Sequence, residues 1–158
     1  MTDWQRYEAV ATEILNALAE EFQLQRVEPK QLVSGKRSGR MWEIDAEGIS
    51  LHDGGIVLVE VRSSRKGRVK AEQIGGLAYR IFDTGAASGI VVSPLPLQKG
   101  AKQLARAEGI LAVRLRVPCT PEVFVLQFLN RILMRLPSDA FSSSATIVGG
   151  SLESVEPK

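Results

Sequence analysis

The stretch that decides the fold is MWEIDAEGISLHDGGIVLVEVR, residues 41–62. In residues 41–51, apolar and acidic side chains alternate with the period of two that is typical of a half-buried strand. HDGG, residues 52–55, is typical of a turn, because aspartate and glycine tolerate the left-handed backbone of a tight hairpin. IVLVEV, residues 56–61, is a continuous apolar run of the kind found in a strand buried on both faces. We therefore predict an antiparallel hairpin here.

The residues before this hairpin indicate a helix and then a further strand. From Thr2 to Phe22 the apolar residues step by three and four, which predicts an amphipathic helix. Leu24 to Val33 is shorter and is interrupted by Pro29, and we expect one strand within it. Ser34 to Arg40, with the sequence SGKRSGR, is a polar, basic, glycine-containing loop.

The residues after the hairpin alternate between helical and strand patterns. We predict helices over Val69–Phe82 and Leu97–Glu108 and strands over Ala87–Ser93 and Ile110–Leu115. A β-α-β-α-β order favours parallel strands joined by helical crossovers. The fold class expected is α/β, with a mixed central sheet flanked by helices.

The C-terminal part carries a long apolar helix and a tail. Residues 121–136 contain more apolar surface than one core face needs, so this helix either packs against a second copy of the chain, forming a homodimer, or lies buried in its own domain. Residues 137–158 are rich in serine and glycine and predict a flexible tail. The expected organisation is one domain over residues 1–136, with its core at about 4–116.

Composition excludes several classes of protein. At 158 residues, 44% hydrophobic and 24% charged, the chain is neither disordered nor fibrous. No run of eighteen apolar residues and no secretory signal pattern is present, so we expect a cytoplasmic protein without a membrane partner. A single cysteine, Cys119, and a single histidine, His52, exclude a disulfide framework and a His/Cys zinc site. Any bound metal is then expected to be a hard cation held by carboxylates.

Charge is unevenly distributed along the chain. Residues 1–60 carry 6 basic and 11 acidic side chains, whereas residues 61–135 carry 13 basic and 4 acidic ones. This asymmetry indicates either an anionic partner such as DNA or an unevenly charged, solvated surface. The densest basic cluster follows the hairpin, as a clamp on the phosphate backbone or a solvated loop: Arg65, Lys66, Arg68 and Lys70.

Two carboxylates on the paired strands are the candidate chemical groups. Asp45 lies within one strand and Glu60 near the end of the other, where an acidic group is costly unless its charge is offset. A divalent cation relieves the repulsion between two such groups. Arg62 follows Glu60 by two residues and so projects from the same face of the strand. The alternative is a structural network in which both acids pair with Arg62 and Arg40.

This pattern resembles a known nuclease motif. Asp45, followed after a hairpin by Glu60-Val61-Arg62, is similar to the motif of the PD-(D/E)XK nuclease superfamily, with arginine where lysine is usual. Tyr7-Glu8 resembles the first-helix position that supplies a glutamate in Mrr-like restriction endonucleases and Holliday-junction resolvases. Gln73, in the helix expected after the motif strand, is similar to a polar position that those proteins often carry. The segment Gly85–Leu115 is similar to their ending, so the resemblance covers about residues 4–116.

The resemblance implies a restriction-endonuclease-like core that hydrolyses DNA with Mg²⁺ or Mn²⁺. Asp45, Glu60 and the carbonyl of Val61 would bind the metal, and Glu8 would hold a second ion or its water. Arg62 would take the place of the catalytic lysine. Gln73 would contact the site or the DNA backbone.

Two features of the sequence depart from that family. Ile44 stands where a proline often precedes the aspartate. Arg62 has too high a pKa to deprotonate water, although it can stabilise negative charge in a transition state. A catalytically inactive nuclease fold that binds DNA or serves in assembly is therefore the alternative. Glu8 is equally explained by the helix dipole, and Gln73 by a surface or capping role. Because neither Asp45 nor Glu60 is expected to fill the core, we expect their replacement to leave the fold intact.

Overall fold

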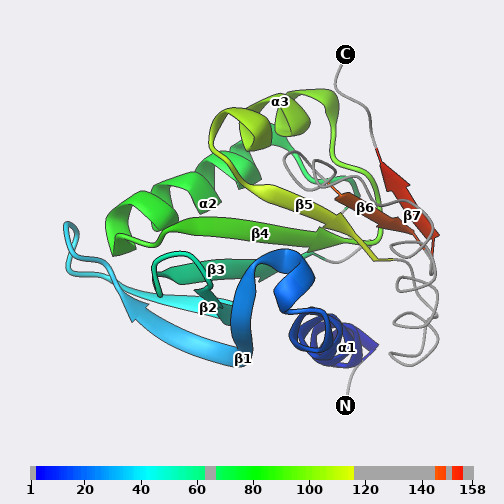
Figure 1. The fold of residues 1–158 in the computed structure, drawn as a ribbon. Coiled ribbons are helices and arrows are strands. Elements are labelled where there is room, and N and C mark those ends of the chain that lie inside the picture. Colours follow the sequence, from blue (N-terminus) through cyan, green and yellow to red (C-terminus); the bar gives the residue numbers. More distant parts are fainter. Residues whose placement is uncertain (1–2, 63–66, 116–144, 149–150, 155–158) are drawn as a thin grey trace.

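The structure is a computed structural model that describes residues 3–62, 67–115, 145–148 and 151–154. Its main body is a five-stranded sheet in the order β1-β2-β3-β4-β5, with helices on both faces (Figure 1). The elements in chain order are α1 (Asp3–Ala17), η1 (Glu20–Phe22), β1 (Leu24–Ser34), β2 (Met41–Ser50), β3 (Ile56–Val61), α2 (Ala71–Thr84), β4 (Ser88–Ser93), α3 (Lys99–Ala107), β5 (Leu111–Arg114), β6 (Ala145–Val148) and β7 (Ser151–Ser154).

The sheet is mixed, as the order of elements predicts. β1 pairs with β2 and β2 with β3 in antiparallel fashion, whereas β3, β4 and β5 run parallel. The helices α2 and α3 each connect two parallel strands, because such strands need a crossover. The α/β fold class and the hairpin expected at residues 41–62 are confirmed.

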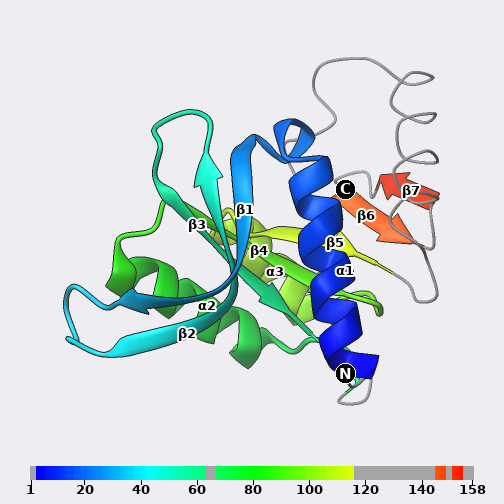
Figure 2. The same ribbon diagram turned by 90° about the horizontal axis from the view of Figure 1, so that it is seen from below.

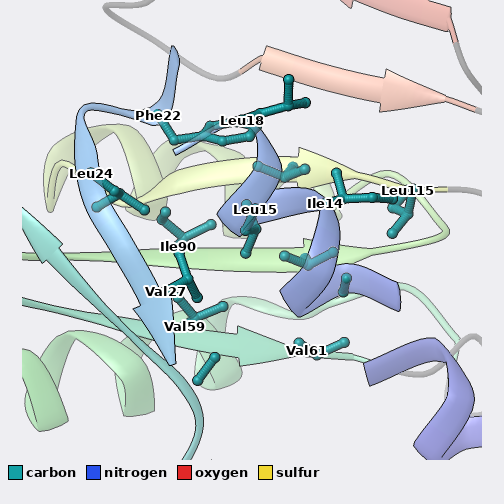
Figure 3. Packing of buried hydrophobic residues seen from close by; sticks show 14 of the residues in the cluster. Ile14, Leu15, Leu18, Phe22, Leu24, Val27, Val59, Val61, Ile90 and Leu115 are labelled. Atoms are coloured by element: carbon teal, nitrogen blue, oxygen red, sulfur yellow. The ribbon is translucent and has the colours of Figure 1, made fainter. Parts of the chain in front are cut away.

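Side chains at alternate positions of the central strands pack in two separate hydrophobic cores, one on each face of the sheet. Val57, Val59 and Val61 of β3 pack in one cluster with α1, and Leu58 packs in the other with α2 and α3. Figure 2 shows α1 on one side of the sheet and α2 and α3 on the other. Figure 3 shows Ile14 and Leu15 of α1 lying over Val59, Val61 and Ile90. Side chains of β3 with even numbers therefore face α2, which decides where Glu60 points.

The N-terminal elements differ in extent from those expected. The helix expected over residues 2–22 ends at Ala17, and a separate 3₁₀ turn follows at Glu20–Phe22. β1 runs through Pro29 despite the missing N–H. β1 is an edge strand, with β2 as its one neighbour in the sheet, and edge strands tolerate a proline because one side of their backbone has no strand to bond to.

The turn between β2 and β3 uses the chemistry expected of it. Gly54 has φ +68°, and the Asp53 carboxylate accepts a bond from the N–H of Gly55 at 2.9 Å. His52 is exposed there and its ring nitrogen lies 2.9 Å from the Gln23 side-chain oxygen. These residues close the hairpin and lie at the opposite end of β3 from Glu60.

The C-terminal region is described only in part. The predicted helix at 121–136 and Cys119 lie outside the described residues. β6 and β7 pair as a short antiparallel hairpin, which differs from the fully flexible tail expected over residues 137–158. Among the helices of the described ranges, none is long and apolar enough to cross a membrane.

Candidate functional site

Asp45 and the end of β3 meet where the β2–β3 ladder finishes. The paired residues run from Ile49↔Ile56 to Ala46↔Val59. Beyond that pair, Oδ2 of Asp45 accepts a hydrogen bond from the backbone N–H of Val61 at 2.7 Å. A side chain of β2 thus reaches across to β3 in place of a backbone carbonyl. The predicted approach of Asp45 to the Glu60-Val61-Arg62 segment is observed.

Glu60 is buried between two arginines. It is 6% exposed, and its two carboxylate oxygens each form an ion pair, Oε1 with Arg62 and Oε2 with Arg80. Arg62 directly follows β3, and its N–H continues the β3–β4 ladder by donating to the carbonyl of Val92 at 2.8 Å. Arg80 comes from α2, which covers this face of the sheet. Two opposite charges offset the cost of burying the carboxylate.

Arg80 is the site residue that the sequence interpretation missed. It lies within the predicted amphipathic helix, three residues after the buried Leu77 and six after the buried Ile74. Positions three apart share a helix face, so Arg80 was already on the core-facing side. A lone basic residue on an apolar helix face, opposite a buried acidic residue of a strand, is the signal that identifies it.

The four charges influence one another. Burial lowers the pKa of Arg62 from its usual value, the positive charge of Arg80 lowers it further, and Asp45 raises it. Burial likewise lowers the pKa of Arg80, and Asp45 opposes that effect. Both guanidinium groups therefore lie within electrostatic reach of Asp45 as well as in contact with Glu60. Two carboxylates and two guanidinium groups converge in one site.

The site also holds an unused donor. Nε of Arg62 is buried and donates no hydrogen bond to any atom of the described residues. A buried, unpaired donor costs about 1–3 kcal/mol, so this guanidinium is held in place by its ion pair with Glu60 and not by a full set of hydrogen bonds.

The donor atoms are chemically suited to a hard divalent cation, but they form a small set. Asp45, Glu60 and the Val61 carbonyl offer oxygen ligands of the kind that Mg²⁺ binds. Among the residues that the structure describes, no group of three or more His, Cys, Asp or Glu side chains is placed to hold a metal. Both Glu60 oxygens are already paired with arginine, so a metal ion at this carboxylate would have to displace a guanidinium.

Glu8, the candidate from the first helix, comes from a different layer of the fold than Arg80 of α2. It lies on α1, next to Tyr7, whose hydroxyl donates to the carbonyl of Leu115 at 2.8 Å. Figure 2 shows the N-terminal end of α1 beside the carboxyl end of β3. α1 packs on the sheet face opposite the one to which Glu60 points.

Gln73 has a structural role at the start of α2. Its side-chain oxygen accepts a hydrogen bond from the N–H of Lys70 at 2.8 Å. Lys70 stands at the N-cap of the helix with extended backbone angles. This bond satisfies a backbone donor at the helix start, which supports the capping explanation for Gln73.

The predicted phosphate clamp is only partly described. Arg65 and Lys66 lie outside the described residues. Arg68 uses Nε and a terminal nitrogen to donate to the carbonyls of Pro96 and Leu97, each at 3.0 Å. It therefore ties its own loop to the segment after β4. Lys70 is exposed.

Arg40, offered as a partner for the acids, lies elsewhere. Its guanidinium lies 4.7 Å from the ring centroid of Trp42. Of the alternative network, the pairing of Glu60 with Arg62 is present, and the second partner of Glu60 is Arg80 and not Arg40.

The glycine pair in α2 does not mark a close contact between elements. A Cβ built on Gly76 meets nothing within 4 Å, and one on Gly75 makes an ordinary 3.8 Å contact with Leu104. Among the described residues, no other element therefore approaches either glycine closely.

Comparison with known proteins gives the fold. No family model and no curated protein matches the sequence. The chain is similar to a solved structure named "Crystal Structure of Protein of Unknown Function AF1548", with a TM-score of 0.58 and 16% identity, over 84% of this chain and 73% of that one. At that identity the likeness extends to the fold alone.

Proposed function

We propose that this chain hydrolyses DNA phosphodiester bonds in the cytoplasm with the help of Mg²⁺ or Mn²⁺, as a PD-(D/E)XK nuclease of the restriction-endonuclease-like fold. The observation that supports it is the meeting of Asp45 with the Glu60-Val61-Arg62 segment at one end of the sheet. Two acids and a cation from adjacent strands, brought to one site, are what the resemblance requires.

The residues divide the chemistry between them. Asp45, Glu60 and the Val61 carbonyl would hold the divalent cation, which activates water and neutralises charge on the phosphate. Arg62 and Arg80 would bind non-bridging oxygens of the phosphate and stabilise the negative charge that develops there. Hydrolysis forms a bond from the water oxygen to phosphorus and breaks one ester bond. The proton from water is transferred by solvent or substrate, since arginine does not serve as a base.

A second candidate is a catalytically inactive nuclease fold that binds DNA. The ion pairs that occupy both oxygens of Glu60 favour it. In that case the four charges form a structural network, and the protein binds DNA equally well in EDTA and in Mg²⁺. The homodimer through residues 121–136 remains a prediction for either candidate.

The deciding experiment is a cleavage assay on supercoiled, branched and single-stranded DNA with Mg²⁺ or Mn²⁺. We expect cleavage by the natural chain and loss of at least about 100-fold in Asp45→Asn, because a metal ligand is removed. Arg62→Lys should keep or raise the rate, since lysine is the usual residue of the motif. Glu43→Gln, at an exposed position of β2, is the matched control.

Two outcomes contradict the proposal. If the natural chain and Arg62→Lys both leave every substrate intact, the hydrolase proposal fails. If Asp45→Asn cleaves as fast as the natural chain, the activity belongs to another site or to a contaminant. Circular dichroism of each variant separates loss of activity from loss of fold.

A further inference from the structure

The tip of the β1–β2 hairpin and the end of α2 form a basic and aromatic surface that the proposed active site does not use. We name it the hairpin surface and define it by Arg37, Arg40, Trp42, Tyr79 and Phe82. Tyr79 is 50% exposed and Phe82 59% exposed. Exposed apolar side chains that gather on one surface are typical of a site of interaction.

Each arginine of the surface lies over an aromatic ring. Arg37 lies 4.6 Å from the ring centroid of Phe82, and Arg40 lies 4.7 Å from that of Trp42. Trp42 in turn meets Tyr79 edge to face, with centroids 6.2 Å apart. These contacts hold the guanidinium groups against the rings while both arginines stay exposed.

The loop that carries the arginines is anchored by one buried carboxylate. Asp83 is fully buried and accepts bonds from the N–H of Ser38 at 2.8 Å, from its hydroxyl at 2.6 Å and from Trp42 Nε1 at 2.7 Å. A Cβ at Gly35 would collide with the same carboxylate. The basic groups are therefore positioned in advance, which lowers the entropy lost on binding.

The charge of the surface is of one sign. Residues 34–42 contain Lys36, Arg37 and Arg40 and no acidic residue. Asp83, the acid beside them, is buried against the loop. Such a surface is complementary to a polyanion, and its exposed rings distinguish a polyanion with flat bases from an acidic peptide.

We infer that the hairpin surface binds single-stranded nucleic acid, with bases stacked on Phe82 and Tyr79 and phosphates held by Arg37 and Arg40. Bases in a duplex are stacked on each other and cannot stack on these rings, so the surface selects unpaired nucleotides. The choice of a nucleic acid rests on the proposed function. The surface connects to the proposed site, because Trp42 shares β2 with Asp45 and Tyr79 adjoins Arg80.

The inference is tested by binding in EDTA, where no cleavage takes place. Fluorescence anisotropy of the full chain measures affinity for labelled oligo(dT) of about 16 nucleotides and for a duplex of the same length. We expect tighter binding of the single strand. Phe82→Ala should weaken it roughly 5- to 100-fold, the range for loss of one stacked base, whereas Phe82→Trp should retain it.

The arginines are tested by salt dependence. Replacing Arg37 and Arg40 together by Gln should reduce the slope of log affinity against log salt by roughly 1.4, the value for two phosphate contacts on a single strand. Two control variants at exposed positions should bind like the natural chain: Leu51→Ala, just after the end of β2 opposite to Trp42, and Arg106→Gln, on α3. Thermal unfolding of each variant verifies that it is folded.

Three results would overturn the inference: preference for the duplex, unchanged affinity in Phe82→Ala and in the double arginine variant, or displacement of oligo(dT) by poly-glutamate as effectively as by unlabelled oligo(dT). The last result would indicate a surface that recognises charge alone. The Phe82 and arginine variants are also assayed for DNA cleavage in Mg²⁺. If the natural chain does not cleave DNA but its affinity for oligo(dT) depends on Phe82, only the proposed function fails. If the natural chain cleaves DNA but its affinity for oligo(dT) does not depend on Phe82, only this inference fails.

Discussion

The surroundings of Glu60 in the structure give this residue a role that the motif alone does not indicate. In the sequence it is an acidic residue that would serve as a metal ligand. In the structure it is buried and paired through both oxygens with Arg62 and Arg80. The same carboxylate therefore holds a strand to a helix, whatever else it does. Our expectation that its replacement leaves the fold intact is not supported by this burial.

Replacing Glu60 should destabilise the protein. Glu60→Gln removes the negative charge between two partly buried guanidinium groups and leaves them to repel each other, at a cost of about 3 kcal/mol. Urea unfolding followed by circular dichroism measures the change in the free energy of unfolding. Glu43→Gln is the control, because its carboxylate is exposed and lies 3.8 Å from an equally exposed lysine. Equal stability of the two variants would contradict a structural role for the ion pairs.

Asp83 joins two elements that are distant in the sequence. It ends α2, and it accepts hydrogen bonds from the loop between β1 and β2. The strand within residues 24–33, the loop over residues 34–40 and the strand that follows were predicted from the sequence pattern. The contact of Asp83 with this loop was not predictable, because Asp83 and Ser38 are separated by 45 residues and no local pattern links them. The arrangement of the hairpin surface follows from this long-range contact.

The hydrogen bonds of Asp83 make the free energy of unfolding depend on pH. Hydrogen bonds from Ser38 and Trp42 hold the pKa of Asp83 at about 2, below its ordinary 3.8, although burial opposes them. Because the folded-state pKa is the lower one, the contribution to stability is complete above about pH 4 and is lost as the pH falls through about 2. Asp83→Asn should lower the free energy of unfolding at pH 7, and its difference from the natural chain should narrow between pH 4 and pH 2.

Urea unfolding at a series of pH values measures that difference. Glu108→Gln, at an exposed position after α3, should track the natural chain throughout. A gap between Asp83→Asn and the natural chain that stays constant down to pH 2 would show that the charge of Asp83 is not what holds the loop.

The whole molecule is a sheet with two separate cores, and Tyr7 connects its beginning to its last parallel strand. The Tyr7 hydroxyl donates to the carbonyl of Leu115, 108 residues away, and burial raises the pKa of this phenol. Tyr7 and Leu115 belong to the same buried cluster. This one bond ties α1 to the end of the sheet where the proposed site lies.

Removing that bond should weaken the docking of α1. Tyr7→Phe keeps the ring but leaves a buried carbonyl without its donor, which costs about 1–3 kcal/mol. Tyr79→Phe is a matched control, because Tyr79 is half exposed and water can replace its contacts. Hydrogen exchange of α1 and urea unfolding provide the measurements. A Tyr7→Phe variant as stable as the control would mean that apolar packing alone holds the helix.

The sequence by itself determined the local structure of this protein. Strand and helix periods, turn residues and chain order were enough for the α/β class, the β2–β3 hairpin and the parallel strands after it, because each depends on neighbours in the chain. The contact of Asp45 with the backbone of Val61, next to Glu60, also followed from strand pairing.

Only the tertiary structure decided which charges meet. The packing of α2 on the sheet brought Arg80 to Glu60, and the folding of the basic loop onto Asp83 placed Arg40 over Trp42. Partners of this kind depend on how elements pack in three dimensions, and burial sets the strength of their interactions. The spacing of residues along the chain gives neither the packing of the elements nor the burial of the charged groups.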